Sequence, residues 1–216
     1  MSRAGQRERV PQELYKTPRA SFAPLLPYLP DGGTVWEPAC GDGRLVHWMH
    51  ERPNLEAYGS DLFHVKKPFS AGSFTRTLPD PIDFLACKVP PLPCTTICTN
   101  PPYNLALEFA EQATRLAAET FLLLRLGFLA SSARLDFFRA NPLGALFILT
   151  SRPSFVAAAK CENCGAKWQQ EVEEPRVRVH SKLCDGRITY TTTDMADYAW
   201  FYWGTRRFSD TKIIHL

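Results

Sequence analysis

The stretch Val35-Trp-Glu-Pro-Ala-Cys-Gly-Asp-Gly-Arg44 joins an apolar run to a helical pattern through a turn that holds two glycines. Glycine lets the chain turn tightly and lets a ligand approach the backbone closely. A helix that begins at Arg44 points its free N–H groups back toward this turn, which suits a carboxylate or a phosphate. The third glycine of a dinucleotide-binding fingerprint is missing, so an ordinary helix entrance remains the alternative. The stretch predicts a strand–turn–helix unit with a candidate ligand turn.

Outward from this unit, apolar runs that predict buried strands alternate with helical patterns. The runs are Val35 to Ala39, Ala57 to Leu62, Thr95 to Thr99, Thr120 to Leu126, Ala145 to Thr150 and Tyr198 to Trp203, and the helical patterns are Arg44 to Glu51, Leu105 to Ala118 and Ser131 to Ala140. Alternation of this kind predicts an α/β domain with a mostly parallel sheet, here over residues 13–151 and 198–216. Such sheets bind ligands at the carboxyl ends of their strands.

The composition is that of an ordinary globular chain. The sequence has 216 residues, of which 45% are hydrophobic and 22% charged, so one domain with a core can form. It lacks a run of about 18 apolar residues, which excludes a membrane-spanning helix. Residues 1–12 are polar and basic without an apolar signal region, which indicates a flexible arm, with a DNA-contacting arm as the alternative. The net charge of +3 is compatible with nucleic acid without arguing for it.

Two acidic positions follow the glycine turn at spacings that suit a nucleoside. Asp61 ends the next apolar run, about 20 positions after the turn, where a carboxylate can bind both hydroxyls of a ribose; a helix N-cap is the alternative. Asp83 could accept a hydrogen bond from an adenine amine while Phe84 packs on the ring. The alternative for this pair is a turn residue followed by a core aromatic side chain.

The segment Asn100-Pro-Pro-Tyr103 lies between a predicted strand and a predicted helix. Its two prolines fix the backbone and remove two donors, which leaves the Pro101 carbonyl and the Asn100 side chain as rigid acceptors. Two acceptors placed on the hydrogens of an exocyclic amine would turn the nitrogen lone pair out of conjugation, so that it can attack a methyl sulfonium. Tyr103 can stack on the base. A proline-rich turn with an N-cap asparagine is the alternative.

In this order the motifs resemble those of class I S-adenosylmethionine-dependent methyltransferases, and within them the DNA adenine-N6 methyltransferases. The resemblance covers roughly residues 13–155 and the run 198–203. Tyr15-Lys-Thr-Pro18 is similar to the segment over the methionine part of the cofactor, and Arg152-Pro-Ser-Phe155 to the segment whose aromatic ring stacks on the flipped base. The implied cofactor residues are Tyr15, Thr17, Pro18, Glu37, Pro38, Ala39, Cys40, Gly41, Gly43, Asp61, Leu62, Asp83, Phe84 and Asn100, and the implied catalytic residues are Asn100, Pro101, Pro102, Tyr103 and Phe155.

The resemblance also implies the fold and the partner. The expected fold is Rossmann-like, a seven-stranded, mostly parallel sheet whose last strand is antiparallel. The expected substrate is duplex DNA with the target adenine flipped out of the stack, because its amine is unreachable inside the duplex. The chain is compact for this family and similar to phage and prophage forms. The expected location is the cytoplasm of a bacterial or phage-infected cell, and the expected state is a monomer or a homodimer.

Residues 152–197 break the strand–helix rhythm and predict an insert that binds a structural zinc ion. Cys161 and Cys164 form a C-x2-C pair, and fifteen residues later His180 and Cys184 form an H-x3-C pair. Thiolates and imidazole are the ligands of tetrahedral zinc, and a metal would let a short insert fold without a core. Basic residues around the cysteines favour contact with DNA. Idle thiols on a solvated mixed-charge surface are the alternative.

Three other functions compete with DNA adenine methylation. A methyltransferase of the same fold could act on RNA or on a protein glutamine, since the Asn-Pro-Pro-Tyr acceptors suit any planar amide or aryl amine. A catalytically silent, zinc-containing DNA-binding module is the alternative outside enzymes. A metal-dependent hydrolase is disfavoured, because carboxylate and histidine clusters are missing near the predicted strand ends. The seven cysteines without a signal segment favour a reducing compartment.

Overall fold

The framework of the protein is a seven-stranded mixed sheet. The computed structural model describes residues 16–63, 76–153, 155–161, 167–171, 188–192, 196–208 and 213–215. The sheet order is β10-β5-β9-β4-β3-β1-β2. Its strands are β1 (Gly33–Glu37), β2 (Leu55–Gly59), β3 (Thr96–Thr99), β4 (Glu119–Arg125), β5 (Ala145–Ile148), β9 (Tyr198–Trp203) and β10 (Ile213–His215).

Strand directions confirm the predicted α/β class and its antiparallel strand. The pairs β1–β2, β1–β3 and β3–β4 are parallel, whereas β9 runs antiparallel to both β4 and β5. The antiparallel strand occupies Tyr198–Trp203, as the apolar run predicts. A three-residue strand that the sequence analysis did not predict, β10, then pairs parallel with β5 at the edge of the sheet.

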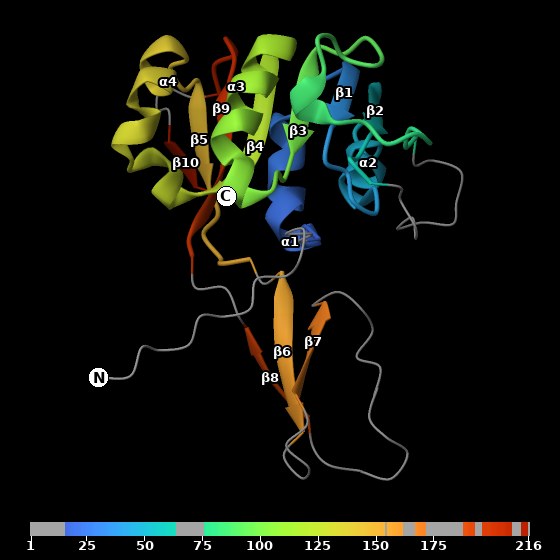
Figure 1. Cartoon of the computed structure of the whole chain (residues 1–216), viewed down its shortest axis with the longest axis vertical. Helices are drawn as coiled ribbons and strands as arrows, with labels where there is room; N and C mark the ends of the chain where they lie inside the picture. The colour runs from blue at the N-terminus through green and yellow to red at the C-terminus, as the bar shows by residue number, and fades with distance from the viewer. Residues whose placement is uncertain are drawn as a thin grey trace.

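Helices cover both faces of the sheet (Figure 1). The α-helices are α1 (Arg19–Phe22), α2 (Arg44–Met49), α3 (Ala106–Leu116) and α4 (Leu135–Ala140), and the 3-10 helices are η2 (Ala23–Tyr28), η3 (Phe84–Ala86), η4 (Tyr103–Leu105), η5 (Leu126–Leu129) and η6 (Ser132–Arg134). The predicted helix from Leu105 corresponds to α3, which ends where Ala117 becomes extended. The helix predicted over residues 131–140 is divided into η6 and α4.

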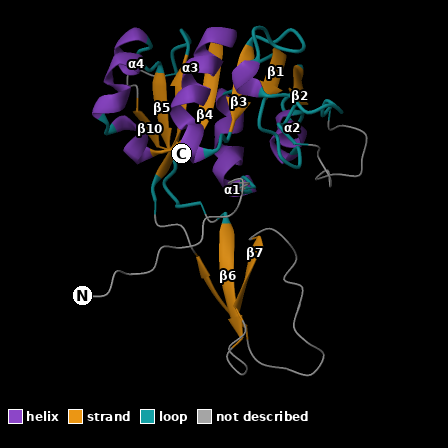
Figure 2. Ribbon diagram, viewed as in Figure 1, coloured by secondary structure: helices purple, strands orange, loops and turns teal. Residues whose placement is uncertain are grey.

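The side chains of β9 show why this strand lies inside the sheet. All six of its residues are buried. Tyr198, Trp200 and Tyr202 join the core cluster that contains Phe22 of α1, whereas the alternate residues join the cluster that contains Phe137 of α4. Successive side chains of a strand point to opposite faces, so a run of large apolar residues suits a strand covered on both sides. Figure 2 shows the helices α3 and α4 against the strands of the larger sheet.

A second, three-stranded antiparallel sheet lies within the segment predicted as an insert. It has the order β7-β6-β8, with β6 at Val156–Cys161, β7 at Lys167–Glu171 and β8 at Ile188–Thr192. Figure 1 shows it apart from the larger sheet. In the described ranges of the chain, no helix is long and apolar enough to cross a membrane.

Candidate cofactor and acceptor site

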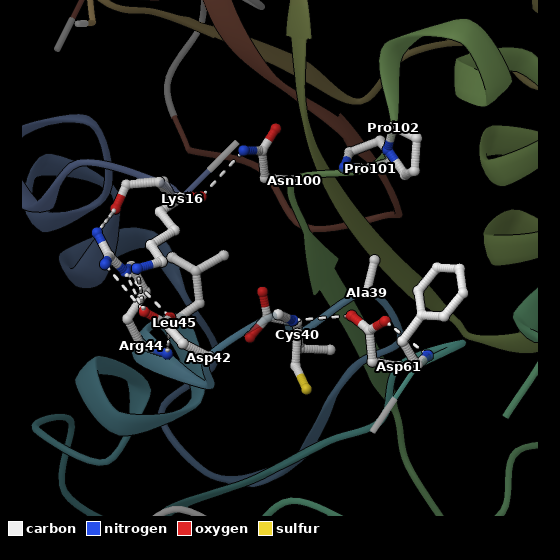
Figure 3. Close-up of a pocket in the computed structure, with 14 residues that line it drawn as sticks. Lys16, Ala39, Cys40, Asp42, Arg44, Leu45, Asp61, Asn100, Pro101 and Pro102 are labelled. Atoms are coloured by element: carbon white, nitrogen blue, oxygen red, sulfur yellow. Dashed lines mark hydrogen bonds and ion pairs between the residues drawn. The ribbon is translucent and has the colours of Figure 1, made fainter. Parts of the chain in front are cut away.

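A pocket opens where the chain order of the sheet reverses. β1 has β2 on one side and β3 on the other, so the connections that leave β1 and β3 diverge at this point. In open α/β sheets, the carboxyl ends of strands at such a point form the ligand crevice. The pocket is lined by Lys16, Thr17, Glu37, Ala39, Cys40, Gly41, Asp42, Arg44, Leu45, Asp61, Phe63, Asn100, Pro101 and Pro102 (Figure 3). The glycine turn, the first acidic position and the Asn-Pro-Pro segment thus share one cavity.

The glycine turn has the backbone shape that requires glycine. Gly41 and Gly43 have φ angles of 54° and 81°, in the left-handed region that other residues rarely adopt. The Cys40 N–H donates to the Ser60 carbonyl at 3.0 Å, and the Gly41 N–H donates to Asp61 Oδ2 at 2.8 Å. These bonds tie the turn to the end of β2, so the two halves of the predicted cofactor site are held together by the protein itself.

Glu37 places a buried carboxyl group at the base of the pocket. Glu37 is the last residue of β1, and it is only 2% exposed. Burial, with the nearby Asp42 and Asp61 carboxylates, raises the pKa of Glu37 well above its usual range. A cationic ligand would favour the ionised carboxylate, because an opposite charge offsets the cost of desolvation. The site therefore suits a ligand that carries an ammonium or a sulfonium group.

Asp61 is held at the pocket wall by two backbone donors. Its Oδ2 accepts from Gly41, and its Oδ1 accepts from the Phe63 N–H at 3.0 Å. Each carboxylate oxygen keeps a second lone pair for a ribose hydroxyl. Phe63 also lines the pocket and is 49% exposed, so an aromatic face is available beside the ribose position. Leu62, predicted as a cofactor residue, is 52% exposed and is absent from the pocket wall.

Asp83 and Phe84 lie outside the pocket lining. Asp83 is the N-cap of η3, and its Oδ1 accepts from the Leu85 N–H at 3.0 Å. Phe84 is 3% exposed and packs against Trp36 and Phe109, with ring centroids 5.3 and 4.8 Å apart. The structure therefore assigns Phe84 to the core, and the aromatic ring at the pocket is Phe63. Pro18, Pro38 and Gly43 flank the lining residues without joining them.

A buried cation beside the turn was not predicted from the sequence. Arg44 is 7% exposed and donates from Nη2 to Asp42 Oδ2 at 2.9 Å and from Nη1 to the Thr17 carbonyl at 3.3 Å. Lys16 Nζ lies 3.8 Å from the same Asp42 carboxylate. An arginine at the first position of a helix is ordinarily exposed to solvent. Only the contact of Arg44 with Thr17, 27 residues away, shows that Arg44 helps to form the pocket wall.

The acceptor end of the pocket is formed by Asn100, Pro101 and Pro102. Asn100 follows the last residue of β3, and its Nδ2 donates to Thr17 Oγ1 at 3.0 Å. Pro101 is buried, and its ring fixes the backbone φ angle, so its carbonyl has a fixed direction. These residues border the cavity that holds Glu37 and Asp61, which puts the predicted acceptors within one site with the predicted cofactor residues.

Tyr103 and Phe155 come together in an aromatic cluster with Tyr198. The Tyr103 and Phe155 ring centroids are 6.2 Å apart at an interplanar angle of 65°, and Phe155 is 4% exposed. The Arg125 guanidinium lies 5.1 Å from the centroid of Tyr103, and Arg125 Nε donates to Tyr198 Oη at 3.1 Å. The two rings meet edge to face, so they leave no gap between parallel faces. A base can stack between them only if one side chain rotates.

The predicted zinc ligands fall mostly outside the described residues. Cys161 is the last residue of β6, whereas Cys164, His180 and Cys184 lie outside the described residues, as does Tyr15. Within the ranges that are described, His, Cys, Asp and Glu side chains form no group of three that could hold a metal. The zinc site stays a prediction. Cys40, Cys87, Cys94 and Cys98 of the main domain are free thiols, and Cys40 and Cys98 are buried.

No protein-family model and no curated protein matches the sequence. Several solved structures are similar in fold. A Thermoplasma acidophilum protein, 1320, is 13% identical, with 87% of this chain and 88% of that chain covered and a TM-score of 0.46. A TehB-like SAM-dependent methyltransferase from Corynebacterium glutamicum is 13% identical over 87% and 88% of the two chains, with a TM-score of 0.44. A Pyrococcus horikoshii protein described as a candidate RNA methyltransferase is 10% identical over 80% and 73%, with a TM-score of 0.43.

Proposed function

We propose that the protein transfers a methyl group from S-adenosylmethionine to the N6 amine of a flipped-out adenine in DNA. The observation that carries this proposal is the single pocket in which the glycine turn, Asp61 and Asn100-Pro101-Pro102 meet. The chemistry of the wall fits the cofactor: Glu37 suits its cationic half, Asp61 its ribose, and Phe63 its adenine. The cofactor would supply an electrophilic methyl group on sulfur.

The residues of the acceptor end would orient the incoming amine. The Asn100 side-chain oxygen and the Pro101 carbonyl would each accept a hydrogen bond from the amine. These two bonds would turn the nitrogen lone pair toward the methyl carbon. The amine nitrogen would form the new N–C bond, while the sulfur of the cofactor, held by the pocket that Glu37 and Asp61 line, would keep the electron pair of the broken C–S bond. The methylated amine would then lose its extra proton to solvent. Catalysis of this kind depends on positioning and on preorganised acceptors.

A nucleic acid acceptor is favoured over a protein glutamine by the charge beside Tyr103. Arg125 lies over the Tyr103 ring, and both residues border a cavity of about 390 Å³. The charged residues of its wall are Arg125, Arg134 and Glu108, so the wall has a net positive charge. Cations next to the acceptor end suit a phosphate backbone, whereas a glutamine side chain brings no phosphate. RNA would meet the same residues, so it is the first alternative. A silent zinc-containing DNA-binding module is the second.

A structural zinc ion in the insert belongs to the same proposal. Cys161 ends β6 and is the register partner of Ile188, the first residue of β8. Cys164 falls within the connection from β6 to β7, and Cys184 precedes β8 by four positions. In the sequence, therefore, Cys164 follows β6 and Cys184 precedes β8 closely, while the backbone register brings Cys161 opposite Ile188. Metal analysis of purified protein tests this directly: about one zinc per chain is expected, and its loss in Cys164→Ser. Wild-type protein without bound metal would refute the zinc site.

The experiment that tests the function offers tritium-methyl S-adenosylmethionine together with duplex DNA, tRNA and a protein extract. The labelled acceptor is digested and the modified unit identified by mass. N6-methyladenine in DNA is the expected product, and label in RNA or protein would replace the substrate while keeping the mechanism. Absence of label, with absence of cofactor binding, would refute the enzyme and favour the silent binding module.

A further inference from the structure

Thr17 lies between the two halves of the site. It is 3% exposed, it lines the pocket, and it directly precedes Pro18, the N-cap of α1. It was predicted as a cofactor residue, by resemblance to a segment over the methionine part of the cofactor. Its observed side-chain partner is Asn100, the residue that would accept from the amine.

The contact sets the direction of the Asn100 amide. Nδ2 of Asn100 donates to Thr17 Oγ1 at 3.0 Å, 83 positions away along the chain. The oxygen and the nitrogen of a side-chain amide lie in one plane, on opposite sides of the Cβ–Cγ bond axis, so a bond that holds the nitrogen also fixes where the oxygen points. In Figure 3 the Asn100 nitrogen faces the segment that carries Lys16, and its oxygen points away from it.

Thr17 is itself held by groups from the cofactor turn. Its carbonyl accepts from Arg44 Nη1 at 3.3 Å, and Arg44 donates to both oxygens of Asp42. The guanidinium also lies 6.0 Å from the centroid of the Trp48 ring. A β-branched side chain has few χ1 choices, so a fixed Thr17 backbone also places Oγ1. A chain of contacts thus runs from Asp42 through Arg44 and Thr17 to Asn100.

We propose that Thr17 is the positioning residue of Asn100, and that its hydroxyl holds the amide with the oxygen directed at the acceptor amine. The inference rests on the proposed function for the role of that oxygen. It assigns Thr17 an effect on the methyl-transfer step itself, in addition to its place in the wall of the cofactor pocket. The hydroxyl oxygen, and not the bulk of the side chain, carries this effect.

Three variants separate the hydroxyl from the packing. Thr17→Val keeps the branched shape and removes Oγ1, and Thr17→Ser keeps Oγ1. Thr99→Val is the matched control. Thr99 is buried and adjoins Asn100 in the sequence, and the Thr99 Oγ1 makes no hydrogen bond within the described part of the chain. For each variant we would measure the single-turnover rate at saturating cofactor, the cofactor Kd, and the side-chain NH2 resonances of Asn100 by ¹⁵N NMR, assigned through their loss in Asn100→Asp.

Thr17→Val should lower the single-turnover rate about tenfold to a hundredfold, since one oriented catalytic hydrogen bond is commonly worth that much or more. Its cofactor Kd should stay within about threefold. The Asn100 NH2 signals should shift and exchange faster with water. Thr17→Ser should recover most of the rate, and Thr99→Val should stay within about twofold of the wild type.

Two outcomes would overturn the inference. One is an Asn100 signal that does not change in Thr17→Val, and the other is a Thr17→Val defect confined to cofactor Kd with a normal rate at saturation. The NMR result does not depend on which molecule is methylated. If the wild-type protein methylates no acceptor, the proposed function fails, while the contact between Thr17 and Asn100 is still tested.

Discussion

Replacing Gly59 with alanine should damage the cofactor turn from behind. Gly59 ends β2, where its N–H donates to the Arg76 carbonyl and its own carbonyl accepts from Leu78, both at 2.8 Å. An added Cβ would lie 2.7 Å from Cys40 Cβ and 2.9 Å from Val46 Cγ2. Because both neighbours are buried and β2 is held by these bonds, the turn that carries Cys40 must move.

The expected loss of stability in Gly59→Ala follows from the cost of overpacking. Extra atoms in a packed interior cost about 1–3 kcal/mol. At about 2–4 °C per kcal/mol for a chain of this size, Tm should fall by roughly 2–12 °C. Displacement of the turn should also weaken cofactor binding about tenfold, which corresponds to about 1.4 kcal/mol.

Calorimetry of unfolding and of S-adenosylmethionine binding would measure both effects. Gly127→Ala is the matched control, because a Cβ at that position would meet no atom within 4 Å. This control should keep its Tm within about 1 °C or gain slightly, as an alanine restricts the unfolded chain. If Gly59→Ala kept both its Tm and its cofactor affinity, or if Gly127→Ala lost as much, the added Cβ would not displace the turn.

Three further predictions concern residues that line the pocket. Burial raises the pKa of Glu37, so the native state keeps the Glu37 proton at pH values where the unfolded chain has lost it. The free energy of unfolding therefore falls as the pH rises from about 4.3, the usual glutamate pKa, to the raised pKa. Glu37→Gln should therefore match the wild type near pH 4 and exceed it at pH 8 in urea unfolding; equal curves at pH 8 would contradict this. Asn100→Ala should lower turnover about a hundredfold or more while cofactor Kd stays within a few-fold, and near-normal turnover would refute the mechanism. Phe63→Ala should weaken cofactor binding about tenfold by calorimetry, since a stacked ring is worth roughly 1–3 kcal/mol, with little change in Tm because the ring is half exposed; unchanged affinity would remove Phe63 from the adenine site.

The parts of the fold that follow from short-range sequence pattern were predictable. The run Tyr198 to Trp203 is apolar at every position, and it forms the strand that is covered on both faces. The turn at Gly41 and Gly43 was predictable for a similar reason, because two glycines between a strand and a helix imply unusual φ angles. The strand β10 was not predictable, since three residues with an exposed edge leave no periodic signal.

The residues of the pocket that were missed depend on contacts distant in sequence. Nothing next to Arg44 in the sequence shows that it reaches Thr17, because that contact joins positions 27 residues apart. Phe63 and Phe84 are the same residue type, and each follows an aspartate closely. Only packing separates them: Phe84 fills the space between Trp36 and Phe109, whereas Phe63 is left at the open pocket wall.

The two halves of the site differ in how the chain assembles them. The cofactor half is built over a short stretch, since the Gly41–Asp61 hydrogen bond spans 20 positions. The acceptor half needs distant segments, because Asn100 meets Thr17 across 83 positions and Tyr103 meets Tyr198 of β9. Long-range contacts cost more chain entropy to form. The contact of Tyr103 with Tyr198 also requires β9 to be in place beside β4. In this arrangement the groups that would orient the amine are assembled only when α1, β3 and β9 are all in place, whereas the glycine turn and Asp61 require only the β1–β2 unit.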